Sequence, residues 1–363
     1  MNTLKVLHVG EYVKGGVATY IKEVVSYQRN ARDIEEVYVM LSKNNSEKNF
    51  NIDPNSIIFY EYYRKPLYFI KAIIEVYRTI RKLEPDIVHA HSTFAGFFVR
   101  FPFLFVKKRP KIVYCSHGWS FLMDLPKYKK RVFAFIERIL SIKTDILINI
   151  SYNELHNSVK YHLPKEKSIV IYNGISEVEK QGNVDIPIDE SKINLLFVGR
   201  FDRQKGLDIL LNFFSSYKNN NIRLYIIGDS VLNNQGIKIP KNVINLGWVK
   251  NEIIDLYYKK FDAIIMPSRW EGFGLVAIEA MKNKKPVIAS NRGALPEIIK
   301  NGKNGFIFDL DNMETLQGIL DRINKDILKK LGEEGYRNFK ERFTSLRMNI
   351  EIIEQYKKLL QIE

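Results

Sequence analysis

The turn after the strand pattern 262–266 carries residues whose types and spacing could do chemistry. It lies at a strand's carboxyl end, where ligands bind in open α/β sheets. Glu271 stands in the turn, while Gly272 and Gly274 let the backbone approach a ligand closely. The helix expected from about Gly274 offers free N–H groups and a positive dipole end to an anion. Glu279 falls about one and a half turns into that helix, so the pattern predicts a site for an anion that also carries hydroxyl groups.

A second loop also follows a buried strand pattern, at 193–199, and leads into a helix. It holds Arg200 and Lys205, two cations suited to a diphosphate whose negative charge grows as it leaves. The alternative is a pair of solvated cations on an ordinary loop. The residues alone leave both interpretations open.

Two further places in the first half of the chain could touch a ligand. Gly15 and Gly16 follow the first strand pattern and open a helix, so their N–H groups could face a phosphate. They lack the G-x-G-x-x-G pattern of a dinucleotide site. His117 lies just past a strand end, beside Gly118. Its imidazole either donates to a hydroxyl or a developing charge, or is a structural histidine.

The sequence predicts no metal site. His89 and His91 share one face of a strand pattern, but no third ligand has a convincing spacing. The acid pair Asp309 and Asp311 follows a short strand pattern and is better interpreted as the cap of the next helix.

Short β-branched runs alternate with helix-period segments along the chain, which is typical of parallel α/β sheets. The first series of strand patterns comprises 4–10, 35–41, 56–60, 86–90, 111–115, 145–150 and 168–172. The second series comprises 193–199, 222–228, 243–247, 262–266, 286–289 and 305–308. Helical patterns include 66–83, 127–143 and 345–362. We therefore expect two similar α/β units with a ligand site between them.

The domain boundaries follow from a polar stretch without apolar periodicity. It covers 173–191 and is the predicted linker between a first domain, 1–172, and a second domain, 192–343. Residues 344–363 form a last amphipathic helix.

Composition narrows the class of protein. Hydrophobic residues make up 45%, so the chain can build real cores, and the single cysteine, Cys115, cannot form an internal disulfide. The amino-terminal residues turn polar too early for a signal peptide, and no apolar run reaches the length of a spanning helix. We expect a cytoplasmic protein, soluble or peripheral to the inner face of the plasma membrane.

The net charge of +15 is concentrated in one region. Residues 61–143 hold 17 basic and 6 acidic side chains, which attracts phosphates of nucleic acid, lipid or a diphosphate substrate. Within it, 127–143 combines an apolar helical pattern with basic residues, and Lys107, Lys108 and Arg109 follow a phenylalanine-rich segment. The helix at 127–143 either packs its apolar side on the sheet or contributes to docking on an anionic membrane.

Taken together, these motifs resemble the family 4 glycosyltransferases. The resemblance runs in order through both halves, to about residue 310, and its carboxyl-terminal part is specific. The residues that carry it are Gly15-Gly16, His117-Gly118, Asn173-Gly174, Gly199-Arg200, Lys205-Gly206, and Glu271 with Glu279. The resemblance implies a GT-B fold: α/β, with two Rossmann-like doubly wound domains facing across a cleft, the first for the acceptor and the second for the nucleotide-sugar donor. It also implies that the last helix returns to the first domain.

Residue roles follow only by carry-over from this family. Glu279 would hold the ribose, and Arg200 and Lys205 the diphosphate. Glu271 and the backbone of the next four residues would contact the donor sugar and phosphates, while His117 would act at the sugar's reacting region. Further donor contacts would come from Gly15, Gly16, Gly272, Phe273, Gly274 and Leu275, and from Trp248 and Val249 at the base. His117, Glu271, Arg200 and Lys205 would be the catalytic set, with no metal and no cofactor.

The expected function is retaining transfer of a hexosyl unit from a nucleoside-diphosphate sugar to an acceptor hydroxyl. A UDP-sugar is favoured and a GDP-sugar is the alternative. The acceptor would be a polyprenyl-diphosphate-linked sugar or oligosaccharide in bacterial surface polysaccharide biosynthesis. Asn291 and Arg292 depart from many relatives in a loop that touches the donor sugar, so the sugar stays open. A GT-B epimerase or a sugar-phosphate synthase is the enzymatic rival. A nucleic-acid-binding protein is the rival of another class, but no nucleic-acid-binding motif accompanies the basic charge.

Overall fold

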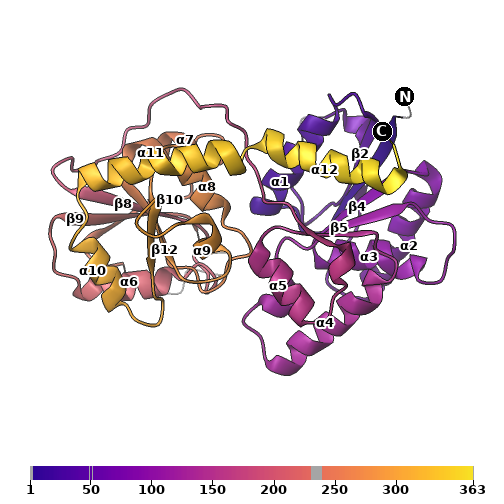
Figure 1. Ribbon diagram of the computed structural model, residues 1–363, viewed down its shortest axis with the longest axis horizontal. Helices are drawn as coiled ribbons and strands as arrows, with labels where there is room; N and C mark the ends of the chain where they lie inside the picture. Colours follow the sequence, from indigo (N-terminus) through magenta and orange to yellow (C-terminus); the bar gives the residue numbers. More distant parts are fainter. Residues whose placement is uncertain (1–2, 49, 51, 230–238, 363) are drawn as a thin grey trace. The chain divides into compact units, whose positions relative to one another are not determined.

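The structure is a computed structural model that describes residues 3–48, 50, 52–229 and 239–362 (Figure 1). The chain divides into two compact units. Unit 1 comprises Met1–Ser176 with Ser345–Glu363, and unit 2 comprises Glu177–Thr344. The predicted linker, 173–191, lies outside the helices and strands, and the division between the units falls within it.

Unit 1 contains a seven-stranded sheet in the order β3-β2-β1-β4-β5-β6-β7, with all its strand pairs parallel. The strands are β1 (Leu4–Gly10), β2 (Ile34–Ser42), β3 (Ile57–Tyr60), β4 (Ile87–His91), β5 (Lys111–Cys115), β6 (Ile146–Asn149) and β7 (Ser168–Val170). The strand order reverses between β1 and β4, as in doubly wound folds, so a ligand site is expected beyond the carboxyl ends of these two strands.

Helices cover both faces of this sheet because right-handed crossovers that run in opposite directions from β1 fall on opposite sides. One face carries α1 (Gly16–Gln28), with α12 (Ser345–Leu360) packed beside it (Figure 1). The other face carries the next four α-helices along the chain. These are α2 (Pro66–Leu83), α3 (Thr93–Phe103), α4 (Lys127–Ser141) and α5 (Tyr152–Lys160).

Unit 2 contains a six-stranded parallel sheet in the order β10-β9-β8-β11-β12-β13. Its strands are β8 (Ile193–Val198), β9 (Ile222–Ile227), β10 (Val243–Gly247), β11 (Ala263–Met266), β12 (Val287–Ser290) and β13 (Gly305–Phe308). Its helices are α6 (Leu207–Ser216), α7 (Ile254–Lys260), α8 (Leu275–Lys282), α9 (Leu295–Ile298), α10 (Glu314–Leu320) and α11 (Lys325–Arg342). The switch of strand order lies between β8 and β11, the two strands that lead into the predicted donor loops.

The thirteen predicted strands are all present, each within two residues of its predicted ends. The central strands of both sheets are buried on both faces, which is why their sequences read as continuous apolar runs. Among the helices of the described residues, none is both long and apolar enough to cross a membrane.

Candidate active site

Lys205 and Glu271 come from different loops of unit 2 and meet at the carboxyl ends of β8 and β11. Lys205 Nζ lies 2.7 Å from Glu271 Oε2, and Ser268 Oγ donates to the same carboxylate at 3.3 Å. Both side chains of the ion pair are largely buried, at 18% and 10% exposed. A charge pair in this position can bind an anion and a hydroxyl side by side.

Two glycines make this meeting possible. Gly206 has φ +71°, and a Cβ there would lie 2.0 Å from the carbonyl oxygen of Pro267. Gly293 has φ +59°, and a Cβ there would lie 2.0 Å from the carbonyl oxygen of Glu271. Because a side chain at either position would collide with backbone, only glycine lets these loops approach so closely.

Arg200 lies on the same loop as Lys205 and is more accessible, with 44% of its side chain exposed. Its guanidinium is 3.0 Å from Asp202 and donates to Gln204 Oε1 at 3.2 Å. Asp202 also accepts from the backbone N–H of Lys205 at 3.1 Å, which fixes the loop. Both predicted diphosphate-binding cations are thus paired with acidic neighbours.

Glu279 lies half-buried on α8, where Tyr258 from α7 donates a 2.8 Å hydrogen bond to its Oε2. Burial raises the pKa of Glu279 above the ordinary value, an effect that Asp255 reinforces and the hydrogen bond from Tyr258 opposes. Asp255 itself pairs with Lys282 at 2.8 Å. The Glu279 carboxylate is therefore oriented by the Tyr258 hydroxyl.

The backbone between these two glutamates turns into α8. Gly274 precedes the helix with φ +101°, and Leu275 is the first helical residue. Gly272 is half-buried, whereas the Phe273 ring is buried, with its centroid 5.8 Å from that of Phe343. The donor contact expected at Phe273 can therefore come from its backbone and not from its ring.

The two residues predicted at the nucleotide base differ in exposure. Trp248 follows β10 with 63% of its surface exposed, while Val249 is buried. An exposed indole can stack on a flat base, whereas the Val249 side chain packs inside.

Three predicted site residues belong to unit 1. Gly15, with φ +56°, precedes α1, and Gly16 is its first residue. A Cβ added at Gly15 would meet no neighbour, so the space beside it is open. His117 follows β5 in the left-handed region, with φ +54°, and is half-buried.

The structure corrects the prediction that His89 and His91 have no third potential ligand beside them. His89 and His91 do have a third partner, because β1 pairs with β4 and places His8 directly opposite His89. His8 Nδ1 lies 3.0 Å from His91 Nε2, and His91 Nδ1 lies 3.0 Å from His117 Nε2. His8, His89 and His91 offer nitrogens within 4.8 Å of one another, so the fold supplies the third nitrogen that the sequence spacing did not show.

Sequence reasoning also missed Tyr258 and Ser268, the hydroxyl groups that hold Glu279 and Glu271. Ser268 lies three residues before Glu271, and this nearness was the available signal. Tyr258 lies on another helix, so only the fold brings it to Glu279.

Two Rossmann-like units, with charged residues at the switch point of the second, define the GT-B class of glycosyltransferases. Residues 180–340 match the family described as glycosyl transferases group 1, and residues 14–178 match glycosyltransferase family 4. The two matched ranges together span most of the chain, so the chain belongs to the glycosyltransferases that these two family descriptions cover.

Relatives and solved structures agree with this assignment. The chain is 37% identical over 336 residues to an uncharacterized 41.2 kDa protein in the cps region of Klebsiella pneumoniae, covering 88% of this chain and 89% of that protein. It is 27% identical to the UDP-Gal:alpha-D-GlcNAc-diphosphoundecaprenol alpha-1,3-galactosyltransferase of Escherichia coli, covering 74% of each chain. Anabaena Alr3699/HepE in complex with UDP-glucose has a similar fold, with a TM-score of 0.79 at 19% identity over 98% of this chain and all of that one.

Proposed function

We propose that the protein is a retaining glycosyltransferase that moves a hexosyl unit from a nucleoside-diphosphate sugar to a hydroxyl of a lipid-linked acceptor. The observation that carries the proposal is the arrangement of Lys205, Glu271 and Glu279 around the carboxyl ends of β8 and β11. It supplies a cation for a diphosphate and two carboxylates for hydroxyl groups.

The donor proposed is a UDP-sugar, with a GDP-sugar as the alternative. UDP is favoured because the Escherichia coli relative is named for UDP-Gal, and the Anabaena structure holds UDP-glucose. In this chain Glu279 would accept hydrogen bonds from the ribose, and the exposed Trp248 would stack on the base. Arg200 and Lys205 would bind the diphosphate.

The chemical step proposed needs no metal ion. As the glycosidic bond to the diphosphate breaks, positive charge develops on the sugar ring and negative charge on the leaving phosphate. The cations of Arg200 and Lys205, together with the N–H groups at the start of α8, would stabilise that negative charge. Glu271 would hold the sugar, and His117 would act at its reacting region.

The acceptor proposed is a polyprenyl-diphosphate-linked sugar used in bacterial surface polysaccharide biosynthesis. The names of two relatives support this: one is encoded in a cps region, and the other acts on a diphosphoundecaprenol-linked sugar. The basic stretch 61–143 in unit 1 would attract the acceptor's diphosphate.

Helix α4 supports a peripheral position on an anionic membrane. Its outward face carries apolar side chains at intervals of three or four residues that continue just past its end, and Phe135 and Ile142 are each 63% exposed. We call this row the α4 stripe: Tyr128, Val132, Phe135, Ile139 and Ile142. Because the inner face of α4 is already packed through Ala134 and Leu140, the stripe faces away from the core.

Charge on α4 has the sign that an anionic lipid surface attracts. The single acidic residue of the helix, Glu137, is buried and paired with Arg100 at 2.7 Å, so it adds no exposed negative charge. Exposed basic residues flank the α4 stripe: Lys127, Lys129, Arg131 and Arg138. This combination of apolar and basic residues is typical of a helix that lies in a membrane interface.

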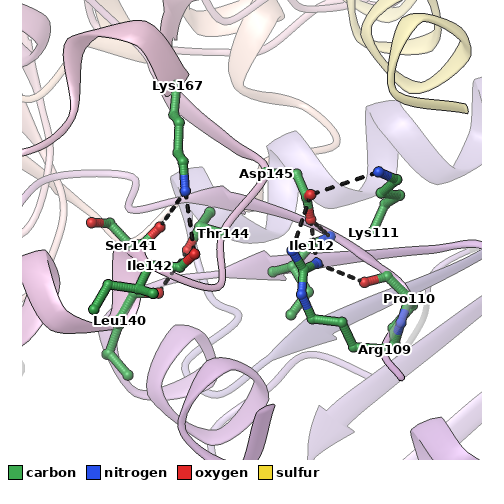
Figure 2. A network of polar contacts seen from close by, with 10 residues as sticks. All are labelled: Arg109, Pro110, Lys111, Ile112, Leu140, Ser141, Ile142, Thr144, Asp145 and Lys167. Atoms are coloured by element: carbon green, nitrogen blue, oxygen red, sulfur yellow. Dashed lines mark hydrogen bonds and ion pairs between the residues drawn. The ribbon is translucent and has the colours of Figure 1, made fainter. Parts of the chain in front are cut away.

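The predicted basic trio 107–109 divides into two kinds of residue. Arg109 donates to both oxygens of Asp145, at 2.5 and 3.1 Å, and so ties the segment before β5 to the segment before β6 (Figure 2). Lys107 and Lys108 are exposed. In the same figure Lys167 donates to the carbonyl oxygens of Ser141 and Ile142, which closes the carboxyl end of α4. Only Lys107 and Lys108 of the trio are therefore proposed to meet lipid.

A transfer assay tests the proposed function. The purified protein is incubated with UDP-galactose, UDP-glucose, UDP-N-acetylglucosamine or GDP-mannose, with and without N-acetylglucosamine-diphospho-polyprenol. We expect one donor to be consumed only when the acceptor is present, with product whose anomeric configuration matches the donor by NMR, also in excess chelator. Acceptor-independent conversion of the donor would favour an epimerase. A product of inverted anomeric configuration would overturn the proposal that the enzyme is retaining. Activity that requires added manganese or magnesium would overturn the proposal that the transfer needs no metal ion.

A further inference from the structure

Four histidine rings and one glutamine form a continuous polar cluster inside unit 1. His8, His89 and His91 are fully buried, and His117 lies at the outer end of the cluster. They share the face of the sheet covered by α1 and α12, because side chains alternate along β1 and β4 and their register aligns His8 with His89. The cluster thus runs from the buried side of α1 to the loop after β5.

Its hydrogen bonds form a single chain of contacts. Cys115 Sγ lies 3.6 Å from His117 Nδ1, and His117 Nε2 lies 3.0 Å from His91 Nδ1. His91 Nε2 lies 3.0 Å from His8 Nδ1. His8 Nε2 lies 2.8 Å from Gln28 Oε1. Each of the three rings in the chain therefore uses both of its nitrogens.

The number of N–H protons on each neutral ring determines which nitrogen donates in each of these hydrogen bonds. A neutral imidazole carries one N–H, and the amide oxygen of Gln28 can only accept, so His8 donates from Nε2. His8 Nδ1 then accepts from His91 Nε2, and His91 Nδ1 accepts from His117 Nε2. His117 Nδ1 is left as an acceptor for the thiol of Cys115. Gln28 is oriented for this role because its amide nitrogen faces the Tyr356 hydroxyl, at 3.5 Å.

Among the described residues, burial is the cause that lowers the pKa of His117, and the Glu154 carboxylate on α5 acts on the neighbouring Cys115 thiol. Its ring faces His91 on β4, Cys115 on β5 and Tyr20 on α1, whose ring centroid is 4.6 Å away. Beyond these lie His8 and His89. Burial lowers the pKa of His117 to about 3 and that of His8 to about 4, and the pKa of His91 falls well below the ordinary value. All members of the chain are therefore neutral at physiological pH.

We propose that His8 and His91 are positioning residues that hold His117 as the neutral Nε2–H tautomer with its ring turned toward β4. The chain ends at Gln28 inside the unit, so it orients a ring and does not conduct protons to solvent. His117 uses both ring nitrogens in contacts within unit 1. It therefore presents an uncharged ring edge and its backbone to a ligand.

The effect of a neutral His117 on the reaction rests on the proposed function. Positive charge develops on the sugar ring during glycosyl transfer, and a nearby imidazolium would repel it. A neutral His117 avoids this repulsion throughout the physiological pH range. Histidine in a less controlled environment would become protonated within that range.

The tautomer can be measured without any activity. Long-range ¹H–¹⁵N NMR on protein labelled with ¹⁵N-histidine separates the two neutral tautomers and the cation, and His117→Ala identifies the His117 signals. Between pH 5.5 and 7.5 we expect His117 to stay in the Nε2–H form, with exposed His156 as the internal reference for a solvated ring. A cationic His117 at pH 5.5, or the Nδ1–H tautomer, would overturn the proposal.

Substitution of His91 tests its role in positioning. In His91→Ala, His117 loses its acceptor and water can enter, so its pKa should move toward about 6.5. The kcat at saturating donor should then be about tenfold lower at pH 5.5 than at pH 7.5, whereas the wild type should be flat. His91→Asn keeps an acceptor and should restore much of the flat profile, and the exposed His162→Ala should behave as wild type.

The outcomes separate the possible failures. If His91→Ala and the wild type share one pH profile and one His117 tautomer, His91 has no positioning role. Stoichiometric zinc or copper in the purified protein, lost in His89→Ala, would show that the three buried histidines bind metal and would overturn the chain. Absence of glycosyl transfer by the wild type would refute the proposed function and leave the NMR result standing.

Discussion

The ammonium group of Lys205, proposed to bind the diphosphate, lies 2.7 Å from the carboxylate of Glu271, proposed to hold the sugar. Arg200 is likewise paired with Asp202. Each of the two cations is thus partly neutralised by an acidic neighbour. The cations gain their full effect only when a phosphate gathers charge beside them.

Replacing Lys205 should therefore slow the reaction more than it weakens donor binding. We expect Lys205→Ala to reduce kcat by about 10² to 10³-fold, as for other groups that stabilise developing charge, with a change below about tenfold in donor Kd. Calorimetry and initial rates measure the two quantities. Lys284→Ala is the matched control, since Lys284 also pairs with a glutamate, Glu333, at 3.2 Å, but on the exposed surface. A weaker donor Kd with an unchanged kcat would show that Lys205 binds the diphosphate equally well in the ground state and in the transition state.

Glu279 should make donor binding pH-dependent. As a proposed ribose ligand, Glu279 would accept hydrogen bonds from both ribose hydroxyls only when it is ionised, and burial raises its pKa above the ordinary value of 4.5. Donor affinity should therefore fall as pH decreases through this raised pKa, which happens at a higher pH than for a solvated carboxylate.

The test compares Glu279→Gln with the wild type by calorimetry between pH 4.5 and 8. The variant should bind the donor about 1.5 to 3 kcal/mol more weakly at pH 8, because a charge-assisted hydrogen bond is lost. Its affinity should no longer depend on this titration. An unchanged Kd at pH 8 would remove Glu279 from the donor site.

Docking on lipid should require the outward face of α4. We expect sedimentation with vesicles of phosphatidylglycerol and phosphatidylcholine, weak binding to phosphatidylcholine alone, and loss of binding as salt rises from about 0.05 to 0.5 M. Phe135→Ser with Ile139→Ser and Ile142→Ser should abolish it at little cost in stability, since these side chains are exposed. Lys107→Glu with Lys108→Glu should also weaken it.

The control for this experiment lies on the opposite face of the same unit. Leu346→Ser with Ile350→Ser removes exposed apolar side chains from α12 and should leave sedimentation unchanged. Arg109 is not changed, because its bonds to Asp145 are structural. Equal binding of the α4 variant and the control would exclude the α4 stripe as the lipid contact.

The buried histidines should make unit 1 sensitive to acid. Their pKa values are lowered by burial, to about 4 for His8 and about 3 for His117, and well below the ordinary value for His89 and His91. Below about pH 6.5 the unfolded chain takes up protons that the folded chain excludes, so stability is lost as pH falls. Each such histidine contributes about 1.4 kcal/mol per pH unit to this slope.

Urea unfolding followed by circular dichroism at pH 5.5, 6.5 and 7.5 measures the slope. Between pH 7.5 and pH 5.5, His89→Gln should lose about 1.4 kcal/mol less of its unfolding free energy than the wild type, because this range spans the titration of one histidine in the unfolded chain. His156→Ala removes an exposed histidine and should leave the slope nearly unchanged. A slope that is the same in His89→Gln and the wild type would contradict the assignment of His89 as neutral in the fold.

The fold was largely predictable because each buried parallel strand corresponds to a short apolar run in the sequence, followed by turn residues. Glu271 and Glu279 were also predictable, since strand, turn and helix follow one another within a few residues. The helix at 127–143 was harder, because periodicity identifies an apolar side without saying what covers it. The structure assigns Leu140 to the core and Phe135 to the surface.

Contacts between distant segments could not be predicted. His8 meets His91 only because β1 pairs with β4 in one register, and a shift by one residue would turn His8 to the other face. Tyr356 reaches His89 at 2.6 Å across 267 residues of sequence. No local pattern encodes such a contact, since it depends on where α12 packs.

The packing of α12 on unit 1 affects the order in which the two units are completed during translation. Chains fold as they leave the ribosome, generally from the amino terminus onward. Unit 2 is continuous in sequence and can fold once Thr344 has emerged, whereas translation of unit 1 begins before that of unit 2, and unit 1 lacks α12 until residues 345–360 have been made. Until then the polar groups of Gln28 and His89 that meet Tyr356 have no hydroxyl partner from α12. The first unit to be translated is therefore the last to be completed, and a nascent or truncated chain exposes the apolar surface that α12 covers to chaperones and proteases.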